Sequence, residues 1–357
     1  MPASTTDLTH TLYKKISSLG VFKNRSWIFQ ERFLSPRVLH FSDKQLSWKC
    51  AELQASESYP SRGAEYYGNA KATTPFEYPE FYSTSNNCDA EPLWEKSRRL
   101  CIAFRIWEPV VSTYTKRKLT KDSDKLIAIS AVAREVQHIM QSRYLAGLWE
   151  VDLVSQLAWW CDGVSGVPLT VYRAPSWSWA SRDGQISSAY YPTSDSYYPL
   201  IEILEAVASL VSEDQFGQVH SGHLKLLGQT FDLKSVKAAR YNRPPKIFFN
   251  DRFTTKFLYR KDDHKMKKHI RPKQYHCLPL DIKLEERILF NGLIFESLDV
   301  NKNLYRRVGL LYCPTYLKLT QENFPTDPVL SMLGKIEQIK DGSLIFKRDS
   351  SNYNSIE

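Results

Sequence analysis

The hydrophobic pattern of the chain changes its period near Pro175. Before this residue, apolar side chains recur at intervals of three, four or seven, which is typical of helices. Beyond it they alternate with charged residues over 199–211, 223–233, 276–283, 287–297 and 304–313. Alternation indicates antiparallel strands with one solvated face. The sequence therefore predicts an α+β fold, with a helical amino-terminal unit that includes a short hairpin, followed by an antiparallel β-rich unit of barrel- or sandwich-like form.

Helices in the first half are predicted from apolar spacing, from caps and from proline. Their ranges are 8–19, 24–36, 93–114, 124–140 and 144–160, the last broken near Gly147. Two short apolar runs, 37–41 and 45–50, flank the turn Ser42-Asp43-Lys44 and predict a hairpin. Further turns are predicted at Ser221-Gly222 and Asn291-Gly292.

Five regions follow from these patterns. They are 1–50 with helices and a hairpin, 51–90 as a surface loop, 91–180 as a helical middle unit, 181–320 as the β-rich unit with a basic insertion at 252–273, and 321–357 as a terminal segment. The last stretch, 347–357, is expected to be frayed.

Composition narrows the class of protein. Hydrophobic residues make up 42% of the 357 residues and aromatic residues 13%, enough to bury a sizeable core. No run of about 18 apolar residues and no secretion signal is present, so we expect a soluble, intracellular protein without a membrane partner, cytoplasmic or alternatively nuclear. The six cysteines form no C-x-x-C pair and are interpreted as reduced structural thiols.

The net charge of +9 is concentrated in one stretch. Nine basic residues lie between Arg252 and Lys273 against two aspartates, which gives +7 there. One interpretation is a solvated insertion loop, and the other is a polyanion-binding or nuclear-import patch. The densest part of that patch consists of Lys265, Lys267, Lys268 and Arg271. Because the aromatic residues precede these charges and do not interleave with them, a nucleic-acid partner is not favoured.

Two groups of residues are candidates for a site. Trp27, Gln30, Glu31 and Arg32 lie on one short helix. An indole beside Glu31 could desolvate the carboxylate and raise its pKa, whereas an ion pair with a neighbouring arginine would be ordinary scaffold electrostatics. Trp177 and Trp179 would face the same side of an extended strand. They are interpreted as packing residues, with a ligand-stacking platform as the alternative.

No self-sufficient active site is apparent. The sequence has no G-x-S-x-G elbow, no H-E-x-x-H pair, and neither a G-x-x-x-x-G-K-[ST] nor a G-x-G-x-x-G loop. We therefore predict no catalytic residues, no metal and no cofactor.

Several segments together resemble the fungal heterokaryon-incompatibility (HET) family. Arg25 to Phe41, followed by Trp48 and Cys50, resembles R-G-W-T-x-Q-E-R-L-L-S-P-R-V-L-x-F, but has Ser26 where glycine is usual. The other matching segments are Tyr114–Thr120 (Y-x-x-R-x-L-T), Asp124–Ser130 (D-K-L-x-A), Tyr144–Trp149 (Y-x-A-G-L-W), Arg173–Ser181 (A-P-S-W-S-W-A-S) and Tyr305–Gly309 (Y-x-R-x-G).

The resemblance covers the carboxy-terminal two-thirds of such proteins, and the family's amino-terminal TIR-like core has no counterpart here. It implies a scaffold or regulatory protein, possibly truncated, linked to non-self recognition and programmed cell death. Residues 1–50 would be the end of the HET domain, and the face left by its core would take a protein partner or self-associate, so apolar side chains between residues 8 and 41 should be exposed. The alternatives are polyanion binding through 252–273, and a weak NAD- or nucleotide-directed enzyme with a pocket around Trp27, Glu31 and Trp177.

Overall fold

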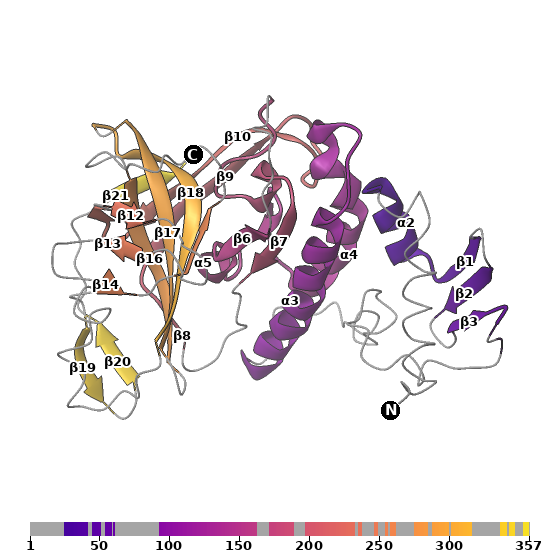
Figure 1. Cartoon of the computed structure of the whole chain (residues 1–357), viewed down its shortest axis with the longest axis horizontal. Helices are drawn as coiled ribbons and strands as arrows, with labels where there is room; N and C mark the ends of the chain where they lie inside the picture. The colour runs from indigo at the N-terminus through magenta and orange to yellow at the C-terminus, as the bar shows by residue number, and fades with distance from the viewer. Residues whose placement is uncertain are drawn as a thin grey trace. The chain divides into compact units, whose positions relative to one another are not determined.

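The fold is taken from a computed structural model, which divides into two compact units, Met1–Gln141 and Ser142–Glu357 (Figure 1). Each unit is described by itself. The residues that the structure describes are 25–41, 45–50, 54–58, 60, 93–162, 171–188, 197–232, 235–237, 246–248, 254–255, 258–261, 275–284, 288–299, 301–315, 336–340, 343–346 and 353–356. The predicted helix over 8–19 and most of the loop over 51–90 lie outside them.

Helices build the core of the first unit. They are α2 (Trp27–Leu34), α3 (Leu93–Thr115), the short helices η5 (Asp122–Lys125) and η6 (Ile127–Ile129), and α4 (Ser130–Met140). The predicted helices over 24–36, 93–114 and 124–140 are confirmed, although the third begins as two short 3₁₀ turns. Phe29 and Phe33 of α2 are buried, and the Phe29 ring lies 5.8 Å from that of Tyr114.

The predicted hairpin is confirmed as β1 (Arg37–Phe41) and β2 (Leu46–Cys50), which a third strand, β3 (Gln54–Ser56), extends. Leu39 lies opposite Trp48, and Phe41 opposite Leu46. Trp48 in turn lies opposite Ala55. Directly opposed residues point to the same side of a sheet, so these five apolar residues share one face.

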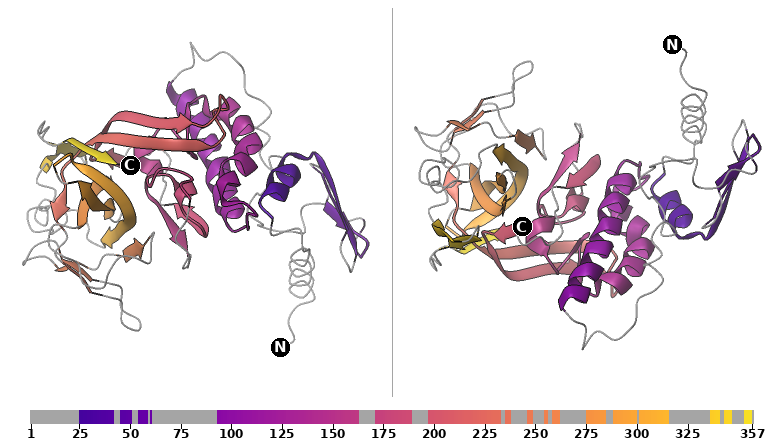
Figure 2. Two further views of the ribbon diagram at one scale, coloured as in Figure 1. Left: turned by 90° about the horizontal axis from the view of Figure 1, so that it is seen from above. Right: turned by 90° about the horizontal axis from the view of Figure 1, so that it is seen from below.

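A nine-stranded sheet dominates the second unit, and its long strands coincide with the predicted period-two runs. Its path is β11-β16-β17-β18-β21-β10-β9, with β15 added at β18 and β8 at β16. The strands are β8 (Tyr197–Pro199), β9 (Glu202–Leu210), β10 (Val219–Leu227), β11 (Phe231–Asp232), β15 (Leu258–Lys261), β16 (Tyr275–Leu284), β17 (Ile288–Asp299), β18 (Leu304–Thr315) and β21 (Tyr353–Ile356). Figure 2 shows β16, β17 and β18 curving strongly, but no sheet closes within the described residues. The α+β class is thereby confirmed.

Smaller elements complete this unit. They are β4 (Tyr144–Leu145), β5 (Leu148–Trp149), α5 (Leu153–Gln156), β6 (Trp159–Asp162), η7 (Trp179–Ser181), β7 (Gln185–Ser188), β12 (Ser235–Lys237), β13 (Lys246–Phe248), β14 (Thr254–Thr255), β19 (Ile336–Lys340) and β20 (Ser343–Phe346). β6 pairs with β7, and β4 with β5, both antiparallel.

The predicted helix over 144–160 is wrong. That stretch contains the β4–β5 hairpin, the single turn α5 and strand β6. Ala146, Gly147 and Asp152 have φ angles of 48°, 101° and 53°. These left-handed residues cannot continue a right-handed helix. The apolar residues that are spaced as in a helix therefore pack in a compact hairpin instead.

Three other predictions are corrected. Gly222 lies inside β10 and Gly292 inside β17, so neither marks a turn. A Cβ on Gly222 would lie 2.6 Å from Pro175 Cγ, and one on Gly292 would lie 2.9 Å from Cys277 Sγ. Both glycines therefore allow close packing. Residues 353–356, expected to be frayed, form β21 between β10 and β18.

Candidate functional site

Three segments that carry the HET resemblance meet in the core of the second unit. The tip of the β4–β5 hairpin packs on the W-S-W segment: the Ser178 hydroxyl donates to Ala146 O, and Trp179 Nε1 donates to Gly147 O at 2.7 Å. A Cβ on Gly147 would lie 2.7 Å from the Trp179 ring. The hairpin backbone thus approaches the indole as closely as only glycine allows.

The sequence predicts an extended strand for Trp177 and Trp179, and this prediction is wrong. Trp177 precedes η7 and Trp179 begins it, with the Ser178 hydroxyl accepting from Ala180 N at 3.0 Å as an N-cap. Trp177 is 0% exposed and Trp179 is 2% exposed. With the indoles buried in this way, the structure supports a packing role for both.

The third segment contributes Arg307, a fully buried arginine on β18. Its guanidinium donates to Leu157 O at 2.7 Å and to Trp159 O, and its Cζ lies 3.5 Å from the centroid of the Trp159 ring. Its backbone N–H donates to Ser176 Oγ at 3.0 Å. A buried cation is tolerated when its donors are satisfied and an aromatic face covers it. Arg307 therefore ties β18 to both the A-P-S-W segment and β6.

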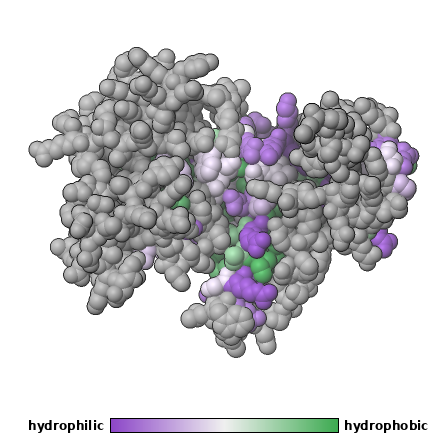
Figure 3. Space-filling model, turned by 60° about the horizontal axis from the view of Figure 1, so that its bottom comes forward, coloured by the Kyte–Doolittle hydropathy of each residue, from purple (hydrophilic) through white to green (hydrophobic). Residues whose placement is uncertain are grey.

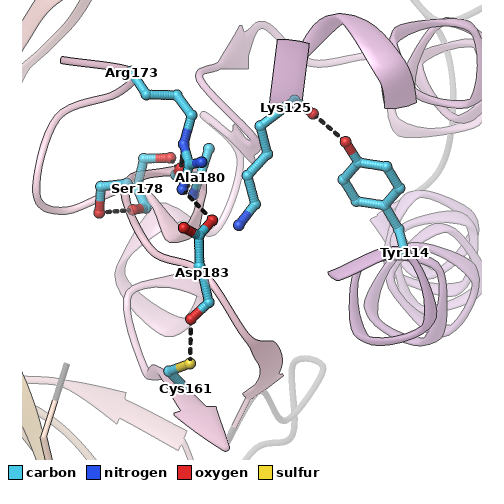
Figure 4. Close-up of polar contacts among 8 residues, drawn as sticks. Tyr114, Lys125, Cys161, Arg173, Ser178, Ala180 and Asp183 are labelled. Carbon is cyan, nitrogen blue, oxygen red and sulfur yellow. Dashed lines mark hydrogen bonds and ion pairs between the residues drawn. The ribbon is translucent and has the colours of Figure 1, made fainter. Parts of the chain in front are cut away.

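A second buried arginine closes the A-P-S-W-S-W-A-S loop from the other end (Figure 4). Arg173 Nε donates to Ala180 O at 2.6 Å, and its Nη2 pairs with Asp183 Oδ1 at 2.8 Å. Asp183 O in turn accepts from Cys161 Sγ at 3.0 Å. Together with Arg307, Trp159 and the hairpin tip, these contacts define what we call the motif core. These polar groups form hydrogen bonds with one another, as expected of residues with a structural role.

A separate polar cluster lies on the large sheet. Asp281 on β16 and Asn291 on β17 are directly opposed, and Asn291 Nδ2 donates to Asp281 Oδ1 at 2.7 Å. Lys283 shares their face two residues along, opposite Tyr197 of β8. Asp281, Lys283 and Asn291 are all buried. This sheet cluster places ionisable groups in an otherwise apolar interior.

Burial sets the electrostatics of the sheet cluster. It raises the pKa of Asp281 to about 7, with a further contribution from Asp152, while the hydrogen bond from Asn291 and the nearby Tyr197 hydroxyl act in the opposite direction. The pKa of Tyr197 is also raised, first by burial and then by the charges of Asp281 and Asp152. A carboxyl group that titrates near neutral pH inside a sheet links folding to pH.

The candidate residues on α2 lie in the first unit. Trp27 is 38% exposed, and Glu31, one turn later, is also exposed. The Glu31 carboxylate forms no ion pair with any described residue, so neither the desolvated carboxylate nor the expected arginine pair is present. Gln30 Oε1 accepts from Ala131 N at 3.4 Å, which joins α2 to the start of α4. Arg32 is half-buried.

The first unit also exposes apolar side chains. On the shared face of the three-stranded sheet, Leu39 is 50% and Phe41 is 71% exposed, and their partners Trp48 and Leu46 are half-buried. We call Leu39, Phe41, Leu46, Trp48 and Ala55 the hairpin face. Among the described apolar residues between 8 and 41, Trp27, Leu39 and Phe41 are exposed as expected, whereas Phe29 and Phe33 are buried. In the space-filling view, apolar and polar residues otherwise lie interspersed on the coloured surface (Figure 3).

The remaining predictions concern the basic patch, metal sites and membrane helices. Lys265, Lys267, Lys268 and Arg271 fall outside the described residues. Among the described residues, no group of three or more His, Cys, Asp or Glu side chains could hold a metal ion. No helix in the described part of the chain is both long and apolar enough to cross a membrane.

Sequence reasoning missed the residues that the structure makes most conspicuous. The sequence assigns no role to Arg307 within its motif, and it predicts Asp281 only as one of the alternating charges of a strand. The signal for Asp281 was its place inside the run Leu278-Pro279-Leu280-Asp281-Ile282, where a lone acid interrupts apolar residues. No signal indicated that Asn291 would lie opposite it.

Comparison with known proteins adds no further assignment: no family model, curated protein or solved structure matches this chain.

Proposed function

We propose that this chain is a HET-related scaffold or regulatory protein that acts by docking a protein partner on its first unit. The observation that carries this proposal is the hairpin face, where Leu39 and Phe41 are half or more exposed on one apolar side of a three-stranded sheet. A contiguous exposed apolar face on a folded unit is typical of an interaction site. Fully burying one phenylalanine contributes about 1.5 to 3 kcal/mol, so Leu39 and Phe41 would serve as anchors within a larger contact.

The occupant that we propose is a TIR-like domain of the HET type. Its support is the resemblance: the segment Arg25 to Phe41 with Trp48 matches the end of the HET domain, and Leu39, Phe41 and Trp48 belong to the hairpin face. Such a domain would bring any catalytic chemistry, while this chain would position it. The motif core suits that role, because its buried hydrogen bonds hold a rigid body without presenting reactive groups.

Binding to a purified TIR-like HET domain, measured by calorimetry, tests the proposal. We expect the wild-type chain to bind and the Leu39→Asp/Phe41→Asp variant to lose at least about tenfold in affinity, because charged side chains cannot be buried on an apolar face. A matched control is Val211→Asp/Leu298→Asp, which charges two exposed apolar residues elsewhere. Equal affinity in all three proteins would refute the docking role, and a doubled mass in light scattering would identify a second copy as the occupant.

The rival functions have their own tests. Robust NAD hydrolysis by the purified chain alone would replace the scaffold proposal with the enzymatic one. Salt-dependent retention on DNA or RNA that disappears when Lys265, Lys267, Lys268 and Arg271 are changed to alanine would favour polyanion binding. For the β-rich unit we keep the barrel- or sandwich-like form as a proposal, supported by the strong curvature of its long strands (Figure 2).

A further inference from the structure

The outer edge of strand β1 is open. In the sheet order β1-β2-β3, β1 pairs with β2 alone within the described part of the chain. Open edges of natural sheets usually carry a proline, a lysine or a β-bulge, which prevents another strand from pairing there. β1 has none of the three, because its sequence is Arg-Val-Leu-His-Phe and its register with β2 is continuous. The strand can therefore accept a second neighbour.

The hydrogen bonds of Leu46 on β2 determine which backbone groups of β1 point to this edge. Leu46 O accepts from Glu57 N at 3.2 Å, and Leu46 N donates to the Glu57 carboxylate at 3.0 Å, so both groups point towards the β3 side. In an antiparallel ladder, two opposed residues either bond to each other or both point away. Phe41 lies opposite Leu46, so its N–H and C=O point to the open edge.

The alternation of the ladder extends this result along β1. Arg37 and Leu39 precede Phe41 by four and two residues in a continuous register, so their backbone groups also point outwards, whereas Val38 and His40 bond to β2. Within the described part of the chain, the three outward residues make no hydrogen bond or ion pair. Their side chains are exposed as well. Backbone and side-chain groups are thus accessible on the same three residues.

From this geometry we infer that the partner docks by adding an extended strand to the outer edge of β1. The inference rests on the proposed docking function and specifies how the TIR-like domain would bind. An added strand would satisfy the outward N–H and C=O groups, and its alternate side chains would lie against Arg37, Leu39 and Phe41. Two of these residues are apolar and one is a cation. The added segment therefore carries two apolar residues and one acidic residue at alternate positions.

Leu39→Pro tests the added strand, with Leu39→Ala as its matched control. Both variants lose the leucine side chain, but only proline also removes the outward N–H, which β2 does not use. In calorimetry with the TIR-like HET domain, Leu39→Pro should bind at least about tenfold more weakly than Leu39→Ala, because a backbone hydrogen bond is lost and the proline ring blocks the edge. Thermal unfolding checks that both variants are folded. Equal affinities would overturn the inference.

Amide exchange of the unsubstituted chain, resolved by residue with NMR, is a second test. In the free chain, the amides of Leu39 and Phe41 should exchange faster than those of Val38 and His40, which bond to β2. Addition of the TIR-like domain should slow exchange at Leu39 and Phe41. If both amides exchange at the free rate when the domain is saturating, no strand is added at this edge.

Arg37→Glu tests the acidic residue of the added segment. Reversing this charge should weaken binding roughly tenfold, because a favourable pair becomes a repulsive one. The control is Arg98→Glu, which reverses the charge of an exposed arginine on α3 and should leave the affinity unchanged. Equal affinities of the two variants would overturn the acidic position.

The failure of this inference can be distinguished from the failure of the docking function. If the wild-type chain does not bind the TIR-like domain, both are overturned. If it binds and Leu39→Asp/Phe41→Asp weakens binding, while Leu39→Pro and Leu39→Ala bind equally, the hairpin face docks the partner through side chains and only the added strand is refuted.

Discussion

The two units use similar residues in opposite ways. In the second unit, tryptophan, serine and arginine are buried and bonded to one another, as in the motif core around Trp179 and Arg307. In the first unit, Trp27 and Arg25 are exposed, and the exposed hairpin face belongs to the same unit. The contrast teaches that the motifs of the second unit are buried in its core, whereas the Arg25–Phe41 segment of the first unit also presents exposed side chains.

Removing Arg307 should have the largest effect on stability. The Arg307→Ala variant loses two charge-assisted hydrogen bonds and the contact with the Trp159 ring in a fully buried place. We expect a loss of about 4 to 5 kcal/mol in the free energy of unfolding of the second unit. Chemical denaturation measures this loss. The neighbour Arg306 pairs with Glu296 at a partly exposed site, so Arg306→Gln should cost about 1 kcal/mol or less. If the two variants lost similar amounts of stability, the structural role of Arg307 would be contradicted.

Stability should also depend on pH through Asp281. Its pKa in the folded state, about 7, lies above the ordinary value of 3.8, so the folded chain holds a proton that the unfolded chain releases between these values. The free energy of unfolding should therefore fall as pH rises from about 4 to about 7, by up to about 4 kcal/mol. The groups coupled to this carboxyl are Asp152 and Tyr197.

An Asp281→Asn variant isolates this effect. It keeps an acceptor for Asn291 Nδ2 but cannot ionise, so its unfolding midpoint in denaturant should change little over this pH range. We expect it to match the wild type near pH 4, where Asp281 is protonated in both states, and to exceed it near pH 8. A wild-type profile that rises between pH 4 and pH 7, with the variant parallel to it, would show that Asp281 is not the responsible group.

Gly147→Ala should have a smaller but definite cost. Gly147 has a φ of 101°, and an added Cβ would lie 2.7 Å from the Trp179 ring, so strain and overpacking combine to about 2 to 3 kcal/mol. The adjacent Ala146→Gly substitution is the control, because it removes a Cβ at a positive φ where Gly147→Ala adds one. Ala146 has a φ of 48°, where glycine carries no steric penalty, so thermal unfolding should change by less than about 1 kcal/mol. Equal costs at both positions would argue against the tight contact.

The hairpin face should show the smallest effect on stability. Phe41 is 71% exposed, so Phe41→Asp should change the free energy of unfolding by about 0.5 kcal/mol or less. Thermal unfolding of this variant beside the wild type checks this. A loss of several kcal/mol would mean that the side chain supports the fold of the first unit and is not reserved for a partner.

The sequence predicted regular elements well where one period persisted. Helix α3 and strands β16 to β18 follow from long runs of a single spacing. The β4–β5 hairpin did not, because its left-handed residues include Ala146 and Asp152, which carry no such signal. The Asn291-Gly292 pair is typical of a turn, but Gly292 lies within a strand and packs closely against Cys277. Short-range patterns cannot distinguish these two uses of glycine.

The candidate site was predicted only in part. The sequence predicts Trp177 and Trp179 as packing residues, but their partners Trp159 and Gly147 lie on other segments of the chain, and only the fold brings them together. The same holds for Arg25 and Lys118, which become neighbours through a single β-bridge.

Hydrogen–deuterium exchange of the chain, with and without a TIR-like HET domain, tests most directly the claim that the first unit docks and the second unit holds shape. We predict that the added domain slows exchange in residues 37–56, which contain the hairpin face, and leaves residues 144–181 and 304–315 unchanged. Protection confined to the second unit, or none anywhere at saturating partner, would contradict it.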